Sequence, residues 1–263
     1  MKIGISFYFG YKLKTKEAVK LLKEHNFESV MTIADKKFTK TQGAISKQVK
    51  YFKKYNIELS SLHMRYEEGE LPNFWVNNKI GDKLESNLKK DLKIAKKYGF
   101  KCVVVHLKGE YSDIGVNRIN RLLKIAREIN VPLAIENIDC QDLFIKVMDS
   151  IDDDYLKFCY DSGHNNCFDP EYNYLSKYGD RLVALHLHDN DGLNDDHTLN
   201  RLGNIDWDKI SLSLSQCPNV NLDYELLMHK GRNMNPKEVL QECHKQGNEL
   251  LKKIKEKRIS LFH

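Results

Sequence analysis

Short apolar runs alternate with longer amphipathic stretches along the whole chain. The runs favour β-strands, and apolar positions that recur three and four residues apart favour helices. The predicted strands cover residues 3–6, 29–33, 57–63, 101–106, 132–136, 156–161, 182–188 and 220–225. The predicted helices cover residues 16–23, 41–55, 82–98, 117–129, 142–149, 171–178, 206–214 and 236–255.

This alternation makes eight strand–helix units and predicts a parallel sheet covered by helices. The length of 263 residues suits a (β/α)8 barrel, which typically needs about 250 residues. No Pro-rich linker or low-complexity tract divides the chain, so we expect an α/β protein with a single TIM barrel over residues 1–263. An open doubly wound sheet is disfavoured, because residues 6–10 after the first strand lack its glycine-rich phosphate turn.

The composition narrows the class of protein further. Hydrophobic residues make up 41% and charged residues 30% of the chain, as in ordinary globular proteins. The longest apolar runs are far too short for a membrane span, and residues 1–6 do not resemble a signal peptide. Six cysteines without a C-x-x-C pair indicate buried, reduced thiols. We therefore expect a cytoplasmic protein with no membrane association.

The net charge of +5 comes from lysines spread over the predicted helices. Proteins that bind nucleic acid more often gather their basic residues on one face. The lysines are therefore interpreted as solvated helix surface, and nucleic acid is an unlikely partner that this pattern does not exclude.

Acidic and imidazole side chains stand at the carboxyl ends of six successive predicted strands. In TIM barrels the catalytic residues come from these ends. Each residue alone could be a hydrogen-bonding or ion-paired structural group, but many such groups at one barrel mouth are costly without a cation. Mixed nitrogen and oxygen ligands suit Zn²⁺ or Mn²⁺ better than Mg²⁺ or Ca²⁺. The six residues are His63, His106, Glu136, Asp161, His186 and Glu225.

Two neighbouring segments add candidate groups. His164 follows Asp161 by one tight turn, and His188 lies two positions after His186, on the same side of a strand. The next loop contains Asp195 and His197, a carboxylate-x-imidazole pair. Asp189 and Asn190 are interpreted as turn-capping or supporting residues rather than ligands.

Four segments carry a family resemblance. They are Ala-Ile-Glu-Asn at 134–137, Cys-Tyr-Asp-Ser-Gly-His at 159–164, Leu-His-Leu-His-Asp-Asn-Asp-Gly at 185–192, and Arg-Leu-Gly-Asn-Ile-Asp-Trp at 201–207. With them the chain resembles the xylose isomerase-like TIM-barrel superfamily over nearly its whole length. That group holds sugar and sugar-phosphate isomerases and epimerases, and zinc AP endonucleases of the endonuclease-IV type.

The epimerase branch implies one divalent metal held by four groups on strands five to eight. The matching positions are Glu136, Asp161, His186 and Glu225. Glu136 and Glu225 would double as the acid–base pair, because a metal that polarises a carbonyl acidifies the neighbouring C–H bond. His164 and His188 would contact the substrate, and Trp75 in the loop 66–78 would cover a sugar ring, unless it only packs on the barrel rim.

The endonuclease branch implies three zinc ions, so the resemblance allows one to three ions. Its nine ligand positions match His63, His106, Glu136, Asp161, His164, His186, Asp195, His197 and Glu225, and Tyr66 matches a DNA-contacting tyrosine. Residues 29–38 nevertheless lack the nuclease patterns, and the spacing from His197 to Gly203 is longer than in nucleases. We therefore expect a metal-dependent sugar or sugar-phosphate isomerase or epimerase first, and a zinc-dependent phosphodiester hydrolase second. A related metal lyase and a non-catalytic sugar-binding protein are the remaining alternatives.

Overall fold

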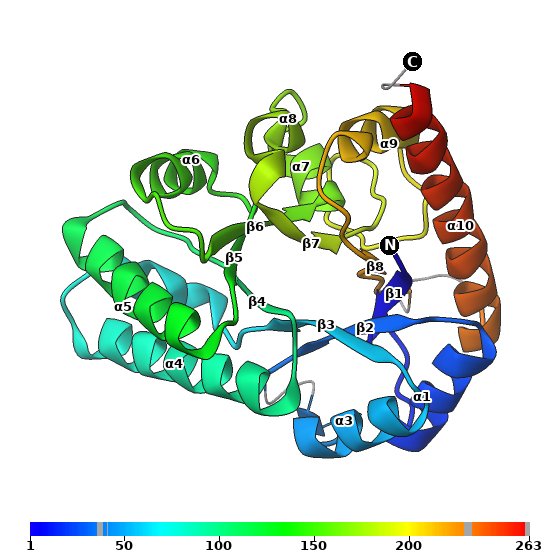
Figure 1. Ribbon diagram of the computed structural model, residues 1–263, viewed down its shortest axis with the longest axis horizontal. Coiled ribbons are helices and arrows are strands. Elements are labelled where there is room, and N and C mark those ends of the chain that lie inside the picture. Colours follow the sequence, from blue (N-terminus) through cyan, green and yellow to red (C-terminus); the bar gives the residue numbers. More distant parts are fainter. Residues whose placement is uncertain (36–38, 41, 229–232, 261–263) are drawn as a thin grey trace.

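The computed structural model describes residues 1–35, 39–40, 42–228 and 233–260. Eight parallel strands surround a central axis, and helices cover their outer side (Figure 1). The predicted TIM barrel is confirmed. The strands are β1 (Ile3–Ser6), β2 (Ser29–Ile33), β3 (Glu58–His63), β4 (Cys102–Val105), β5 (Leu133–Glu136), β6 (Leu156–Asp161), β7 (Leu182–His186) and β8 (Leu222–Tyr224).

The helices follow the strands in the order that the sequence predicts. They are α1 (Thr15–Glu24), α3 (Ile45–Lys54), α4 (Lys79–Tyr98), α5 (Asp113–Ile129), α6 (Gln141–Ser150), α7 (Ser162–Phe168), α8 (Tyr174–Tyr178), α9 (Trp207–Ser215) and α10 (Pro236–Ser260), with 3-10 helices η1 (Glu68–Trp75) and η2 (Gly179–Arg181). Local signals set their ends. Asn78 caps α4 by accepting a hydrogen bond from the Gly81 amide, and Gly99 ends it with φ of 90°.

The barrel closes where β7 and β8, the two ends of the strand order, come together. Its order is β7-β6-β5-β4-β3-β2-β1-β8, and an isolated parallel bridge joins Leu187, just after β7, to Tyr224, the last residue of β8. The Leu187 amide donates to the Asp223 carbonyl at 2.9 Å, and the Glu225 amide donates to the Leu187 carbonyl at 3.0 Å. The barrel is therefore sealed next to the residues that end β7 and β8, where the candidate ligands lie.

Several boundaries differ from the prediction, and three of these differences change the path of the chain. The strand expected to reach His188 ends at His186, because the chain turns there. The segment after Asp161, expected to be a tight turn, is the helix α7, which Asp161 caps by accepting from the His164 amide at 2.7 Å. The helix expected from Thr41 begins at Ile45; Thr41 itself lies outside the described residues.

The core has an inner and an outer part. Inside the barrel, small side chains of β4 to β7 pack together: Cys102, Val104, Ala134, Cys159 and Ala184. A larger apolar layer lies between the strands and the helices. All six cysteines are free thiols, as predicted, and four of them are buried. The inner cluster is therefore small, and most of the apolar core lies between the strands and the helices.

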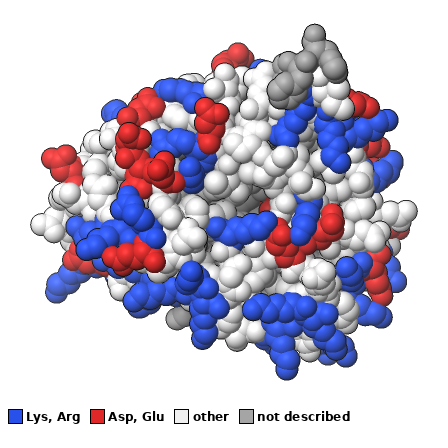
Figure 2. Space-filling model, viewed as in Figure 1, with Lys and Arg blue, Asp and Glu red and all other residues white. Residues whose placement is uncertain are grey.

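The charged surface matches the interpretation of the lysines. On the face in Figure 2, basic and acidic side chains are interspersed, and the densest group of basic residues lies over α3 and α4. Within the described part of the chain, no helix is both long enough and apolar enough to cross a bilayer.

Arg118 of α5 binds the backbone at the end of η1, and substituting it tests how much these contacts stabilise the protein. It is 2% exposed, and its Nη1 donates to the carbonyls of Phe74 at 2.7 Å and Val76 at 2.8 Å. We expect Arg118→Met to lower the free energy of unfolding by about 3 kcal/mol, because buried carbonyls lose their partner. Chemical denaturation measures this loss.

The matched control is Arg121→Met on the same helix. The Arg121 side chain is 51% exposed, and its partner Glu85, which is buried, keeps Lys89 at 2.6 Å as a second partner. Its loss should cost less than about 1 kcal/mol. Equal losses for the two variants would show that the buried carbonyl contacts of Arg118 do not hold the loop.

Candidate metal centre

The carboxyl ends of six strands bring the predicted ligands to one end of the barrel. Each residue either ends its strand or directly follows it. In strand order from β3 to β8 they are His63, His106, Glu136, Asp161, His186 and Glu225. His164 lies in the first turn of α7, and Asp195 and His197 lie in the loop between β7 and α9. The structure therefore brings all nine residues of the predicted ligand set into one region.

A group of four donors forms the centre of this region. Glu136, Asp161, His186 and Glu225 each offer one ligand atom, and these atoms all lie within 4.8 Å of one another. The Nδ1 atom of His186 lies 3.1 Å from Glu136 Oε2 and 3.1 Å from Glu225 Oε2. The two glutamates thus approach the same imidazole nitrogen from strands on opposite sides of β7.

A second group lies on the β3 and β4 side and shares Glu136. The Nε2 atom of His106 is 3.2 Å from Glu136 Oε2, and the Nε2 atom of His63 is 3.5 Å from the same oxygen. The two imidazole nitrogens are 3.2 Å apart. These three residues could hold an ion of their own, with Glu136 bridging to the central group.

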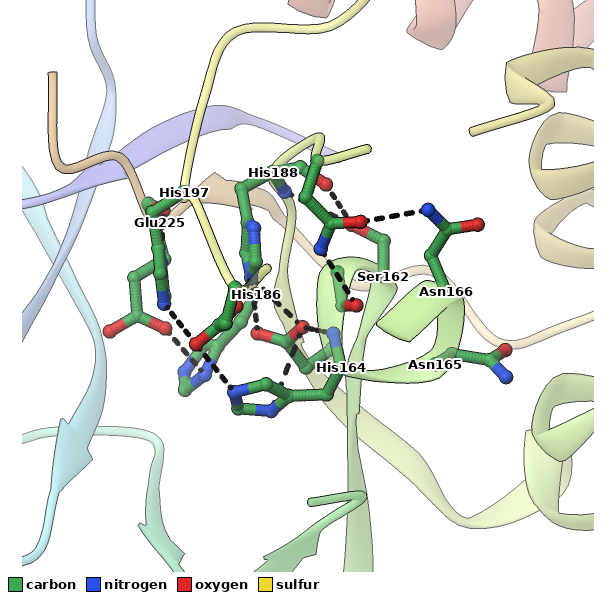
Figure 3. Close-up of polar contacts among 12 residues, drawn as sticks. Ser162, His164, Asn165, Asn166, His186, His188, His197 and Glu225 are labelled. Carbon is green, nitrogen blue, oxygen red and sulfur yellow. Dashed lines mark hydrogen bonds and ion pairs between the residues drawn. The ribbon is translucent and has the colours of Figure 1, made fainter. Parts of the chain in front are cut away.

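A third group involves the loop after β7. Asp195 Oδ2 lies 3.0 Å from His197 Nε2 and 3.4 Å from His164 Nε2. Figure 3 shows His164, His186, His188 and His197 turned toward one another, while Asn165 and Asn166 of α7 point away from them. His197 adopts a positive φ of 49°, which its position in this loop imposes.

The unsatisfied atoms of the central group fit a divalent cation. Both carboxylate oxygens of Glu136 and both ring nitrogens of His186 are buried without a hydrogen-bond partner among the described residues. Their neighbours are near but not aligned for hydrogen bonds. Ligands that share one tetrahedral zinc ion are about 3.3 Å apart, which matches the separations of 3.1 Å around His186. Buried nitrogen and oxygen atoms that converge in this way without hydrogen-bond partners fit a metal site.

The electrostatics of the metal-free chain show the same need for positive charge. Burial by itself would raise the pKa of Glu136 and Glu225, but His186 and the other nearby imidazoles together outweigh it and hold both pKa values well below their usual range. Burial opposes protonation of His197, yet the Asp195 hydrogen bond and the Glu225 charge raise its pKa to about 9. Against the same opposition from burial, neighbouring groups raise the pKa values of His164 and His186. Protons on imidazoles thus neutralise the carboxylates when no ion is bound.

His106 differs from the other imidazoles. Burial lowers its pKa more strongly than Glu136 raises it. Tyr66 packs beside it, with ring centroids 4.6 Å apart. Burial and then the charges of Glu225 and Glu136 raise the pKa of the Tyr66 phenol. Tyr66 therefore stays protonated and offers a hydrogen-bond donor next to a neutral imidazole.

Asn137 supports the centre and was not singled out from the sequence. Its side-chain Oδ1 accepts from the Asp161 amide at 2.8 Å, and its Nδ2 donates to the Asp161 carbonyl at 2.9 Å. Its own carbonyl lies 3.1 Å from His164 Nδ1. The residue adjoins Glu136, but strand alternation alone would point it away from the ligands. Only the pairing of β5 with β6 in the structure shows that Asn137 links Glu136 on β5 to Asp161 on β6.

Two predicted substrate contacts are not supported by their positions. His188 is fully buried; its Nε2 lies 3.0 Å from Asp161 Oδ1, and its ring stacks on His197 at 3.8 Å. It supports ligands because β7 ends at His186 and the chain turns His188 toward α7. A Cβ atom at Gly163 would lie 1.8 Å from the His188 ring, so glycine permits this approach.

Trp75 is the second of these residues. It is 2% exposed, and a Cβ atom at Gly115 would meet its ring at 1.9 Å. Its ring also stacks on Tyr111 with centroids 5.7 Å apart. No ring face is left for a sugar, so packing on the barrel rim is the reading that this structure supports.

Asp189 organises the loop that carries Asp195 and His197. It is fully buried, and its Oδ2 accepts from the Arg201 amide at 2.7 Å and from Trp207 Nε1 at 2.9 Å. Its Oδ1 accepts from the Ile205 amide at 3.1 Å. The interpretation of Asp189 as a supporting residue agrees with these contacts, which tie the start of the loop to its end.

The fold is a TIM barrel with candidate metal ligands at one end, and a family model shows which family the chain belongs to. The family model described as xylose isomerase-like TIM barrel matches residues 19–259. The chain belongs to this family. The resemblance seen in the sequence is thereby confirmed.

Curated relatives match parts of the chain. They include the uncharacterized protein y4fM of Sinorhizobium fredii, 36% identical over 106 residues, and the uncharacterized protein MJ1614 of Methanocaldococcus jannaschii, 26% identical over 143 residues. The matches cover 40% and 52% of this chain. They span only 33% and 56% of the relatives' own lengths.

Solved structures share the fold over the whole chain. A D-tagatose 3-epimerase-like protein has a TM-score of 0.75 at 18% identity, with all of both chains covered. D-psicose 3-epimerase from Clostridium cellulolyticum H10 has a TM-score of 0.70 at 13% identity, and the match covers 98% of this chain and 99% of that chain. An IOLI protein described with a bound zinc atom has a TM-score of 0.72 at 17% identity, and the match covers 97% of this chain and 98% of that chain. At these identities the likeness establishes the fold alone.

The raised histidine pKa values predict that zinc binding releases protons. Ligand imidazoles must lose their protons to coordinate a metal, and the pKa of His197 is about 9 in the metal-free chain. We expect the binding heat at pH 7 to depend on the ionisation enthalpy of the buffer, and the apparent affinity to increase with pH. Calorimetric titration of Zn²⁺ into metal-free protein in two buffers measures this. The control is His244→Gln, on α10 away from the centre, which should release as many protons as wild type.

The thermal stability of the metal-free protein depends on the same protons. The folded pKa of His197, about 9, exceeds the ordinary value of about 6.5. Its contribution to stability is complete below about pH 6.5 and is lost as the pH rises through about 9. We expect the Tm of the metal-free form to fall over this range, and that of the zinc-loaded form to fall less. A Tm that rises over the same range would contradict a protonated His197.

Proposed function

We propose that the protein is a metal-dependent isomerase or epimerase that acts on a sugar by moving a proton next to a carbonyl. The observation that carries the proposal is the central group, in which Glu136 and Glu225 both lie 3.1 Å from His186 Nδ1. In this proposal Glu136, Asp161, His186 and Glu225 hold one divalent ion. The sugar epimerases among the proteins of similar fold support the same choice.

A divalent ion bound here would polarise a substrate carbonyl and the neighbouring hydroxyl group. This polarisation would acidify the C–H bond between them. The two glutamates do the rest. Both are held ionised in the metal-free chain, so each can accept a proton. One carboxylate takes the proton from one face of the carbon, and the other, after gaining a proton from solvent, donates it to the opposite face. The first glutamate then releases the proton it took to solvent, so that the pair is ready for another turnover.

His164 and Tyr66 suit the positioning of substrate oxygens. Both line a cavity that also includes His106. The Nδ1 atom of His164 is held near the Asn137 carbonyl at 3.1 Å, which leaves Nε2 directed toward Asp195 and the cavity. The protonated phenol of Tyr66 can donate to a substrate oxygen.

A second function is favoured by one further observation. The groups His63–His106–Glu136 and His164–Asp195–His197 each offer three ligand atoms within 4.8 Å. Two or three ions in such a centre would suit a phosphodiester hydrolase, because clustered ions stabilise both the attacking and the leaving oxygen. The number of ions bound per chain therefore separates the two functions.

Proton exchange with solvent tests the proposed reaction. We expect the zinc- or manganese-loaded protein to exchange the C–H proton beside the carbonyl of a ketose such as D-tagatose in deuterated water, followed by NMR. Glu136→Gln and Glu225→Gln should each reduce the exchange rate by at least about 10²-fold, because a general acid–base group is lost. The metal content of each variant is measured in parallel, so that loss of the ion is recognised.

Glu242→Gln serves as the control for these variants. Glu242 lies on α10, where it contacts Gln246 and Lys245 outside the centre. This variant should exchange protons at the wild-type rate. A protein that exchanges no ketose proton with any divalent metal would contradict the proposed reaction.

Metal counting tests the second function. If the protein is an epimerase, dialysed protein should retain one tightly bound ion per chain and leave duplex DNA with an abasic site intact. Three retained ions together with cleavage of that DNA, both lost in His197→Ala, would instead establish the hydrolase. Mass spectrometry of the metals and gel analysis of the DNA provide the two readings.

A further inference from the structure

A cavity of about 150 Å³ adjoins the candidate metal centre, with His106, His164 and Asp195 in its wall. The rest of the wall comes from loops that follow β3, β4 and β5 and from the end of α7. These parts differ in chemistry from the ligands. They comprise one lysine, two further carboxylates and several apolar side chains. A substrate bound at the metal centre would therefore also contact the side chains of this wall.

The single lysine of the wall, Lys108, is already neutralised. Its Nζ lies 2.6 Å from Asp139 Oδ2 and 3.5 Å from Glu68 Oε1. Asp139 follows β5 and Glu68 begins η1, so the lysine is held between two different loops. With Asp195, the described residues of the wall carry three carboxylates against one ammonium group. A phosphate group, which brings a charge of about −1.5 to −2, would find no unpaired cation among them.

The opposite part of the wall is apolar and aromatic. Phe168, the last residue of α7, is 43% exposed although it is a large hydrophobic residue. Its ring centroid lies 5.8 Å from that of His164, which places it at the edge of the centre. An exposed ring over a polar cavity has a free face for the C–H side of a sugar, while Glu68 and Asp139 can accept hydrogen bonds from hydroxyl groups.

We propose that the Lys108–Asp139 ion pair and Phe168 determine specificity, and that they select an uncharged sugar and reject its phosphate ester. This inference rests on the proposed function, because it concerns the substrate of the same site. Asp139 keeps Lys108 from acting as a phosphate-binding group, and Phe168 takes the role of ring contact that the sequence pointed to at Trp75. Hydroxyl groups are selected because the carboxylates of the wall accept hydrogen bonds and repel anions.

The first test compares D-tagatose with D-tagatose 6-phosphate on the metal-loaded protein. Binding is measured by calorimetry and proton exchange by NMR. We expect the free sugar to bind at least about tenfold more tightly. Equal or tighter binding of the phosphate ester overturns the inference. Because binding is measured apart from exchange, a protein that prefers the free sugar without exchanging its proton contradicts only the proposed reaction.

The second test changes the ion pair. Asp139→Asn removes the nearer of the two carboxylates at Lys108 and leaves only Glu68 at 3.5 Å. It should improve the binding of D-tagatose 6-phosphate about fivefold, with the free sugar affected less than twofold. The gain should shrink at high salt, since it is electrostatic. The matched control is Asp149→Asn, which frees Lys177 from a similar pair at 2.8 Å between α6 and α8. An equal gain in both variants, or none in Asp139→Asn, overturns the role of the pair.

The third test concerns Phe168. Phe168→Ala should raise the KM for the free sugar about tenfold, because the apolar contact is lost, with little change in kcat. Phe168→Tyr keeps the ring and should stay within twofold of wild type. The residue is exposed enough that neither variant is expected to unfold the chain, which a thermal melt verifies. An unchanged dissociation constant for D-tagatose in Phe168→Ala overturns the contact.

Discussion

The structure depends on one electrostatic constraint, the enclosure of several carboxylates and imidazoles at one end of the barrel. Glu136 shows it most clearly, since it is 1% exposed and faces four imidazoles with no hydrogen-bond partner for either oxygen among the described residues. In a medium of low dielectric such a group is tolerated only beside positive charge. Protons on the surrounding histidines or divalent ions can supply it. The same requirement explains why metal binding and protonation compete here.

The scaffold around this constraint is built to keep ligands rigid. Asn137 joins the ends of β5 and β6 through two hydrogen bonds, and Asp161 caps α7 while it faces the central group. Asp189 ties the long loop after β7 back to the start of α9. Each contact orients a residue that carries a ligand or lies next to one. Rigid support of this kind sets metal affinity, because ligands that are already in place need little reorganisation.

The centre and the cavity beside it differ in physical character: the centre carries the proposed reaction, and the cavity bears on the proposed substrate. Ligand sets of nine residues can serve proton transfer with one ion or hydrolysis with several, so the ligands alone leave the reaction open. The wall of the cavity is more selective. A paired lysine, two rim carboxylates and an exposed phenylalanine favour a neutral polyhydroxy compound over a phosphate. The electrostatics of the wall thus support the proposed sugar substrate.

The sequence by itself determined the barrel and the members of the site. Alternating apolar and amphipathic segments predict eight strand–helix units, and strand ends in a barrel share one face, so His63, Glu136 and Glu225 could be grouped without coordinates. Tertiary structure decided which atoms meet. The helix α7 in place of a turn, the burial of His188 and Trp75, and the pairing of Lys108 with Asp139 all depend on contacts between loops. Strand periodicity specifies a side of the sheet only while the strand lasts, and beyond its end the path of the chain is set by packing between segments distant in sequence.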